Sequence, residues 1–151
     1  ACNRAGSPVW QPLTRAMRDQ AAATDSLKYV RSLAEMQVFS RQIVQSWGRD
    51  FDLLLTPTCA IEPPKVGWVY ETTSDDPMEP LFRAGMMAPF TLYFNLTGQP
   101  AISLPLHTAP SGLPVGIQLV GKPWGEAELI RIASQLEQAA PWRDRKPSMG
   151  A

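Results

Sequence analysis

The sequence contains few of the residues that most catalytic and metal sites require. Its 151 residues include one histidine, His107, and two cysteines, Cys2 and Cys59. The cysteines have neither a C-x-x-C motif nor a metal-ligand spacing, and isolated cysteines are typical of a reducing compartment. A single histidine excludes a His-rich metal site, and no G-x-S-x-G motif supplies the serine of a Ser-His-Asp triad. We therefore expect no metal and no cofactor.

The sequence also lacks an excess of charge of either sign and any long apolar run. Fourteen basic residues balance fourteen acidic ones, which gives no electrostatic reason to expect nucleic acid or an anionic membrane as a partner. No apolar run approaches the roughly 18 residues that span a bilayer. With 44% hydrophobic and 19% charged residues, the chain is expected to be globular. We predict a cytoplasmic location, in line with the isolated cysteines. The absence of an initial Met and the fifteen prolines suggest a piece of a larger protein.

The residues that are present predict helices alternating with short strands. Residues 1–24 are irregular apart from a short helix over 13–23, and residues 25–48 form a long helix that ends at Gly48. Residues 51–56 are apolar without alternation, which predicts a strand buried on both faces. The apolar stripe of the long helix is expected to pack on a sheet, and it consists of Tyr29, Leu33, Met36, Phe39, Ile43 and Trp47.

Residues 57–80 show no helical or strand periodicity, so they predict a long loop that acts as a lid, a site wall or a covering segment. Part of this loop should pack on the rest of the chain, because Trp68 and Tyr70 are costly to leave in water. A helix over 81–96 should kink or restart at Pro89. Strands over 101–104 and 115–120 should be neighbours, with another backbone close to Gly116. A last helix spans 126–139, and residues 140–151 form a loose tail.

Few single residues suggest chemistry. Cys59 follows a strand at the edge where α/β sheets place their sites, but a small buried thiol is the favoured interpretation. His107 is interpreted as a surface or capping residue, and Asp75 and Asp76 as solvated loop carboxylates. The glycines of 112–121 lack phosphate-binding spacing. From the residues alone, the chain has no complete catalytic set.

Two sequence blocks nevertheless resemble the C-terminal part of the amidase signature family. They are NLTGQPAISLP at 95–105 and GLPVGIQLVG at 112–121. The sequence FDLLLTPT at 51–58, the long helix before it and the closing helix agree in order, so that the resemblance covers residues 27–142. It implies an α/β fold in which a mixed β-sheet is covered by α-helices, with residues 1–151 as a single C-terminal segment of an amidase, a hydrolase acting on the C–N bonds of linear amides.

The resemblance also implies a catalytic set that this chain does not contain. Family members use a serine nucleophile, a second serine with a cis peptide bond and a lysine base, all in a Gly/Ser-rich block upstream. Lys28 opens a helix and Lys65 lies in a proline-rich loop, so no catalytic residue is transferred. The implied partner is the N-terminal amidase portion, in the same or a separate chain. The chain alone should be inactive, and the complete enzyme is a possible homodimer that acts on a small-molecule amide.

A role in the substrate pocket can be transferred from the family, since the helix before the Asn-x-x-Gly block can face the acyl side of the substrate. Ordinary core packing is the alternative for these residues. The candidate substrate-binding residues are Gly85, Ala88, Pro89 and Leu92, which share a face at helical spacing, with Thr58 and Cys59 as a second set.

Two other functions remain open. The chain could belong to an amidotransferase that acts in a tRNA-dependent multisubunit complex, or be a non-catalytic interaction domain that kept the fold. Linear, aryl, cyclic and fatty amides all remain possible substrates. A segment of a larger sheet is expected to expose an apolar face and unpaired strand edges.

Overall fold

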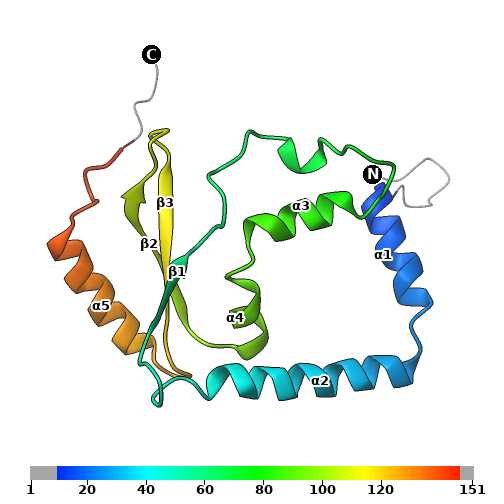
Figure 1. Cartoon of the computed structure of the whole chain (residues 1–151), viewed down its shortest axis with the longest axis horizontal. Helices are drawn as coiled ribbons and strands as arrows, with labels where there is room; N and C mark the ends of the chain where they lie inside the picture. The colour runs from blue at the N-terminus through cyan, green and yellow to red at the C-terminus, as the bar shows by residue number, and fades with distance from the viewer. Residues whose placement is uncertain (1–9, 147–151) are drawn as a thin grey trace.

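The computed structural model describes residues 10–146, so the predictions for 1–9 and 147–151 lie outside the described residues. A small sheet carries one helix on one face, and the remaining helices form an open arc on the other side (Figure 1). The elements, in chain order, are α1 (Pro12–Ala22), α2 (Ser26–Val44), β1 (Leu54–Pro57), η1 (Trp68–Tyr70), α3 (Glu79–Met87), α4 (Leu92–Thr97), β2 (Ala101–Thr108), β3 (Pro114–Val120) and α5 (Glu126–Ala139).

The sheet has the strand order β1-β3-β2. β2 and β3 form the predicted pair of neighbours, antiparallel and in a register that sets Ala101 opposite Val120, with an irregularity between Leu104 and His107. β1 also pairs with β3 in the antiparallel sense, with Leu54 opposite Val120. The predicted α/β class is therefore confirmed, and all strand pairs within residues 10–146 are antiparallel.

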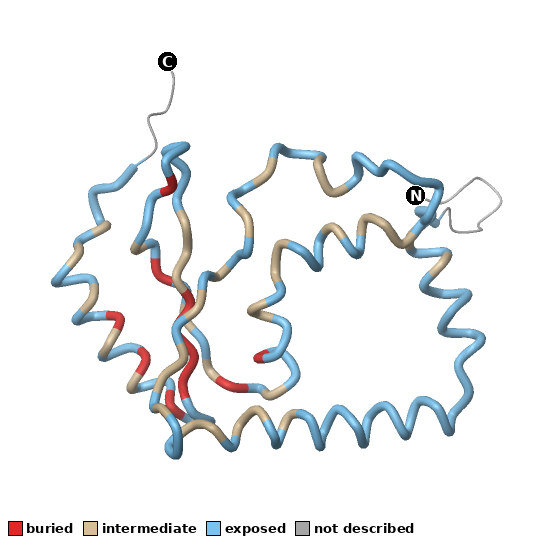
Figure 2. Tube along the Cα trace, in the orientation of Figure 1, coloured by how far each residue is buried: buried red, intermediate tan, exposed pale blue. Residues whose placement is uncertain are grey.

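The hydrophobic core lies between the sheet and α5. Leu104 and Leu119 from the strands meet Leu129 and Ala133 from α5, and all four side chains are buried. Figure 2 shows most of the buried residues in β2, β3 and α5. The predicted helix over 126–139 matches α5, because its apolar residues recur at helical spacing on the side that faces the sheet. Trp142, in the predicted tail, packs against the same core.

The opposite face of the sheet is polar at its centre. Gln118 is 4% exposed, and its Nε2 donates to Thr56 Oγ1 at 3.1 Å and to the Phe90 carbonyl at 3.4 Å. A second amide, that of Gln99, donates to the Gly121 carbonyl at 2.8 Å. These bonds hold the segments before and after α4 on the central strand.

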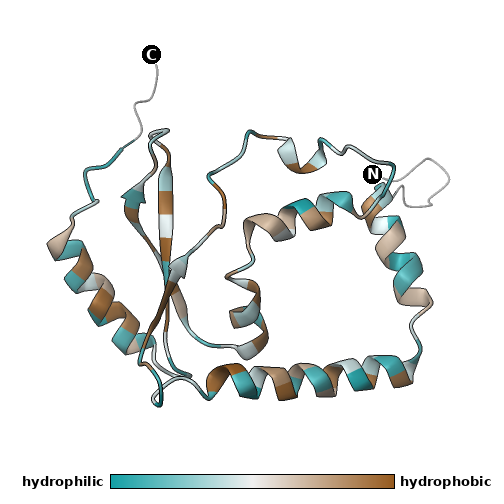
Figure 3. Ribbon diagram, in the orientation of Figure 1, coloured by the Kyte–Doolittle hydropathy of each residue, from teal (hydrophilic) through white to brown (hydrophobic). Residues whose placement is uncertain are grey.

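The prediction that the long helix packs on a sheet is wrong for this chain. The main packing partner of α2 is α4, and Tyr29, Leu33 and Phe39 are 59%, 39% and 42% exposed. Figure 3 shows hydrophobic residues along the length of this helix. The helix also ends at Val44 rather than at Gly48. Helical periodicity identifies the apolar face, but it does not say what covers that face.

The strand predicted to be buried on both faces is also different. β1 begins at Leu54, and burial alternates along it, with Leu55 61% exposed. Phe51 instead packs edge-on against Trp47, with ring centroids 4.8 Å apart. β1 is an edge strand within the described residues, so only one face and one edge of it are covered. A short apolar run does not distinguish an edge strand from a central one.

The segment before the hairpin follows the prediction closely. Pro89 separates α3 from α4, since proline lacks the N–H that would continue the helix. The loop between β1 and α3 contains one short element, η1, and α3 begins at Glu79, two residues before the predicted helix start at 81. Trp68 is half-buried, so part of the loop packs as predicted, whereas Tyr70 is 77% exposed. None of the helices described in the structure is long and apolar enough to cross a membrane.

Candidate functional site

A pair of hydroxyl groups bridges the two outer strands across the polar face of the sheet. Thr58 follows β1, and its backbone N–H donates to the Gly116 carbonyl at 2.8 Å. Its Oγ1 lies 2.6 Å from Ser103 Oγ on β2. A Cβ at Gly116 would lie 2.7 Å from Ser103 Oγ and 2.8 Å from Thr58 Oγ1. The close approach predicted at Gly116 is therefore made by two side chains, not by another backbone.

A cavity of about 140 Å³ lies beside this pair. Its walls come from the start of the 57–80 loop, the end of α3 and the start of β3, and they consist of Cys59, Ile61, Pro63, Met87, Pro114, Val115 and Gly116. Two hydrogen bonds fix the loop here, from Ala60 N–H to the Met87 carbonyl at 2.9 Å and from Ser111 Oγ to Glu62 Oε2 at 2.5 Å. The lining is mainly apolar.

Cys59 lines this cavity and is exposed, so the favoured interpretation of a small buried thiol is wrong. Thr58 lies next to it at the hydroxyl bridge. The structure therefore brings together the two residues of the second predicted set. Their spatial relation to β3 could not be read from the sequence, because Gly116 is 58 positions away from Thr58 and no local pattern links them.

The first predicted set does not share one helical face. Gly85 lies in α3, Ala88 caps its end with a φ of −124° and a ψ of 41°, and Leu92 begins α4. Pro89 lies in the turn between the helices, so the chain changes direction between the first and last of these positions. Met87 is the residue of this segment that lines the cavity, and no sequence pattern indicated it. Substrate binding by the set stays a prediction.

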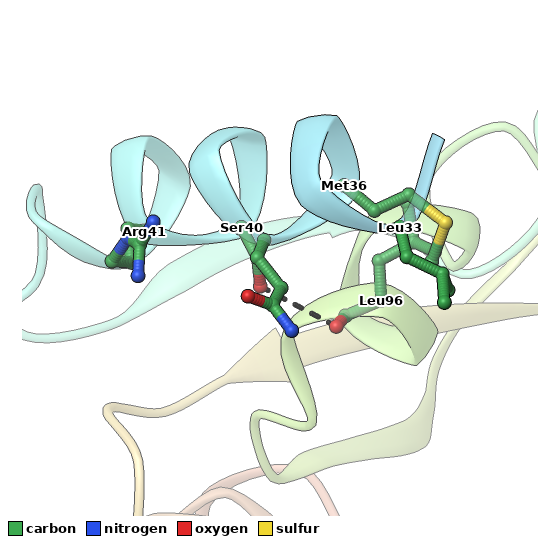
Figure 4. A pocket seen from close by; sticks show the side chains of 6 residues that line it. Leu33, Met36, Ser40, Arg41 and Leu96 are labelled. Atoms are coloured by element: carbon green, nitrogen blue, oxygen red, sulfur yellow. Dashed lines mark hydrogen bonds between the residues drawn. The ribbon is translucent and has the colours of Figure 1, made fainter. Parts of the chain in front are cut away.

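A second hollow, of about 390 Å³, lies between α2 and α4 (Figure 4). Leu33, Met36 and Leu96 gather at one end of it, and Ser40 Oγ donates to the Leu96 carbonyl at 3.4 Å. Gln37 and Arg41 complete the lining. The lining residues that the structure describes include no carboxylate, cysteine or histidine, so they offer shape and apolar surface rather than acid–base chemistry.

The strongest polar cluster joins the long loop to α3. The carboxylate of Glu79 accepts hydrogen bonds from the backbone N–H groups of Thr73 and Ser74, at 2.9 and 3.0 Å, and from the Ser74 hydroxyl at 2.7 Å. Arg83 Nε lies 3.2 Å from the same carboxylate. Hydrogen bonding, first from the Thr73 backbone and then from the Ser74 hydroxyl, lowers the pKa of Glu79 to about 2.

Arg83 extends this cluster to the middle of the loop. One of its terminal nitrogens donates to the Trp68 carbonyl at 2.7 Å, and its guanidinium carbon lies 5.0 Å from the centroid of the Trp68 ring. A cation over an indole face at this distance is attracted by the ring quadrupole. Neither Glu79 nor Arg83 could be identified from the sequence, because their partners depend on how the loop folds back.

The described residues contain no group of three or more histidines, cysteines or acids placed to hold a metal. Among these residues, no hydrogen bond joins a serine hydroxyl to a lysine amine, and Lys122 lies 3.8 Å from Glu128. His107 is exposed near the end of β2. Asp76 accepts a hydrogen bond from the Met78 N–H at 2.9 Å, a local turn contact. The geometry of residues 10–146 thus offers a pocket wall and no complete nucleophile–base pair.

A family model described as Amidase matches residues 3–130, and the chain belongs to this family. It is 30% identical over 158 residues to the 6-aminohexanoate-cyclic-dimer hydrolase of Paenarthrobacter ureafaciens, covering 97% of this chain and 32% of that protein. It is 40% identical over 96 residues to a glutamyl-tRNA(Gln) amidotransferase subunit of Thermodesulfovibrio yellowstonii, covering 64% of this chain and 18% of that one. The predicted family is confirmed.

Solved structures agree with this assignment. A structure of 6-aminohexanoate cyclic dimer hydrolase superposes with a TM-score of 0.84 at 29% identity, covering 97% of this chain and 30% of that chain. A glutamyl-tRNA(Gln) amidotransferase subunit from Thermotoga maritima superposes with a TM-score of 0.66 at 26% identity, covering 85% and 26%. The chain spans about a third of the length of the first curated relatives it matches.

Proposed function

We propose that this chain forms the C-terminal portion of an amide-bond hydrolase and supplies sheet core and one wall of the substrate pocket. The serine nucleophile, the second serine and the lysine lie in the N-terminal portion. The observation that carries the proposal is the superposition on a cyclic-dimer hydrolase. This superposition covers nearly all of this chain but only 30% of the hydrolase chain. The family resemblance of residues 95–105 and 112–121 supports the C-terminal position.

The exposed surfaces support an N-terminal amidase portion as the partner. The apolar stripe of α2 is open to solvent, and β1 and β2 are both edge strands within the described residues. Exposed apolar stripes and unpaired strand edges are features that proteins normally cover. Because the proposed catalytic residues lie in the N-terminal portion, the chain alone is expected to be inactive. The complete enzyme, proposed as a homodimer, assembles the catalytic site over this segment in the cytoplasm, without nucleic acid or membrane as a partner.

The substrate is a small-molecule amide whose acyl part is apolar. The cavity beside Thr58 has mostly apolar walls, including Ile61, Met87 and Val115, which favour hydrocarbon over charged groups. Thr58 and Cys59 contribute to this wall. The other proposed contacts come from the α3–α4 segment, at Gly85, Ala88, Pro89 and Leu92.

The test compares the complete protein, which includes the upstream portion, with the 151-residue chain alone. Amide hydrolysis is followed by the new amino group that appears on the opened 6-aminohexanoate cyclic dimer, by ammonia from a linear aliphatic amide and by p-nitroaniline from a p-nitroanilide. The complete protein should hydrolyse at least one, and alanine at the upstream serine nucleophile should abolish this. Turnover by the purified 151-residue chain would disprove the placement of the catalytic residues, and inactivity of the complete protein on all amides would refute the hydrolase function.

A second candidate is a role within a tRNA-dependent amidotransferase, favoured by the similarity to two glutamyl-tRNA(Gln) amidotransferase subunits. It predicts glutamine-dependent ammonia release and co-purification of the complete protein with a tRNA-binding partner. A hydrolase would act on other amides without such a partner. A third candidate, a non-catalytic interaction domain, predicts that the chain alone is a monomer that unfolds cooperatively.

A further inference from the structure

The long loop and α3 are joined at both ends, so that they form one structural unit. Near the start of the loop, the Ala60 N–H donates to the Met87 carbonyl at the C-terminal end of α3. Near its end, Thr73 and Ser74 donate to Glu79 at the N-terminal end of the same helix. The loop therefore runs back along α3, as the path between β1 and α3 in Figure 1 shows.

The distal attachment is the stronger of the two. We call it the clasp and define it as Trp68, Thr73, Ser74, Glu79 and Arg83. Five hydrogen bonds from the loop converge on the two oxygens of one carboxylate, while Arg83 binds the Trp68 carbonyl and covers its ring. The side chains of Arg83 and Glu79 are 18% and 16% exposed. Hydrogen bonds to a charged group are stronger than those between neutral groups.

The proximal attachment carries the cavity wall. Cys59, Ile61 and Pro63 line the cavity from the loop side, but only two hydrogen bonds, at Ala60 and Glu62, tie this stretch to the rest of the described chain. Pro63 and Pro64 follow directly, and consecutive prolines restrict φ and stiffen the chain. Exposed Val66 and Gly67 complete the link from these prolines to Trp68, so a short stretch of chain joins Trp68 to the cavity wall.

We propose that the clasp positions this cavity wall for the acyl part of an amide substrate, with Glu79 as the residue on which the positioning depends. Glu79 lies at the opposite end of the loop from Cys59, and it is not among the residues that line the cavity. It is therefore a positioning residue that acts through the loop. The inference rests on the proposed function, because the cavity is assigned to substrate there.

The experiment uses the complete protein and three variants. Glu79→Gln removes the charge but keeps the shape of the side chain, and Ser74→Ala removes a single hydroxyl bond of 2.7 Å as a milder change. Glu71→Gln is the matched control, since Glu71 is exposed in the same loop and accepts no side-chain hydrogen bond among residues 10–146. If Glu79→Gln does not fold, Ser74→Ala carries the comparison.

Two readouts measure the loop directly. Trypsin can reach the bond after Lys65, because Val66 is fully exposed. Cleavage also requires the flanking loop to leave its folded path and enter the protease, so the rate reports how often the loop opens. Alkylation of Cys59 by iodoacetamide, read by peptide mass spectrometry, reports the state of the cavity wall. Glu79→Gln should raise both rates by about tenfold and Ser74→Ala by a smaller factor. Glu71→Gln should match the wild type.

The third readout is kinetic. For p-nitroanilides of acetic and hexanoic acid, Glu79→Gln should raise KM for the longer acyl chain several-fold while kcat changes less, as expected when ground-state and transition-state binding fall together. Equal cleavage and alkylation rates in Glu79→Gln and Glu71→Gln would overturn the clasp. Faster cleavage with unchanged Cys59 alkylation would overturn the link to the cavity. If the wild type hydrolyses no amide, the proposed function fails while the first two readouts still decide whether the clasp holds the wall.

Discussion

Substitution of Gly116 by alanine tests the hydroxyl bridge on the sheet. The new Cβ would lie 2.7 Å from Ser103 Oγ, 2.8 Å from Thr58 Oγ1 and 3.2 Å from Thr58 Cβ. Ser103 can rotate away, but the Thr58 backbone N–H is bonded to Gly116 itself at 2.8 Å, so that Thr58 cannot retreat without loss of a strand bond. The substitution must therefore break the 2.6 Å hydroxyl contact.

The magnitude follows from three terms. Overpacking of a close-packed site costs about 1–3 kcal/mol, and loss of one neutral hydrogen bond adds about 1 kcal/mol. Alanine recovers roughly 0.5–1 kcal/mol because glycine loses more backbone freedom in a strand. The net expectation is a loss of about 1–3 kcal/mol in the free energy of unfolding, measured by urea denaturation of the complete protein.

A matched glycine supplies the control. Gly85 lies inside α3, and a Cβ there would meet nothing within 4 Å, so Gly85→Ala should be neutral or stabilise by up to about 1 kcal/mol. Adding Ser103→Ala to Gly116→Ala removes the nearest clash and should recover part of the loss. If Gly116→Ala is as stable as the wild type, the steric account of the bridge is wrong.

Three further predictions concern other parts of the structure. The pKa of Glu79 is lowered from 4.5 to about 2, so the stabilisation from its carboxylate is complete above pH 4.5 and is lost as the pH falls toward 2. In urea denaturation, the free energy of unfolding should therefore fall less steeply with acid in Glu79→Gln than in the wild type. Equal slopes of this free energy against pH would contradict the prediction. Gln118→Leu leaves the acceptors on Thr56 and Phe90 unpaired in a partly buried site and should lower the free energy of unfolding by about 1–3 kcal/mol. Unchanged stability in urea would mean that these acceptors find other partners. Phe39→Ser, on the open stripe of α2, should weaken co-purification of this chain with a separately expressed upstream portion and leave the far-UV circular dichroism of the chain alone unchanged; undiminished co-purification would show that the stripe is not the contact.

Local sequence patterns predicted the elements whose partners lie nearby in the chain. The β2–β3 pair follows from two apolar runs around a Pro/Gly turn, and α5 follows from its apolar spacing and from its proximity to the hairpin it covers. Pro89 marked the break between α3 and α4 because the chemistry of one residue decides it.

The remaining features depend on partners far away in sequence. The stripe on α2 was recognised, but the surface that it meets was not, since periodicity contains no information about a partner outside the helix. Met87 enters the cavity only because α3 ends there and the loop returns to its carbonyl. Glu79 looks like an ordinary acidic residue in the first turn of a helix until the loop brings Thr73 and Ser74 to it.

The position of the core has a consequence for the order of folding. The four buried residues between the sheet and α5 all come from β2, β3 and α5, a continuous stretch of chain whose contacts are mostly short in sequence separation. Such local contacts need little loop closure before they become favourable, and topologies rich in them fold fast. The hairpin with α5 is thus expected to form first and to offer β3 as a template on which β1 adds later. Amides of Leu119 and Leu129 should gain hydrogen-exchange protection before those of Leu54 and Leu33.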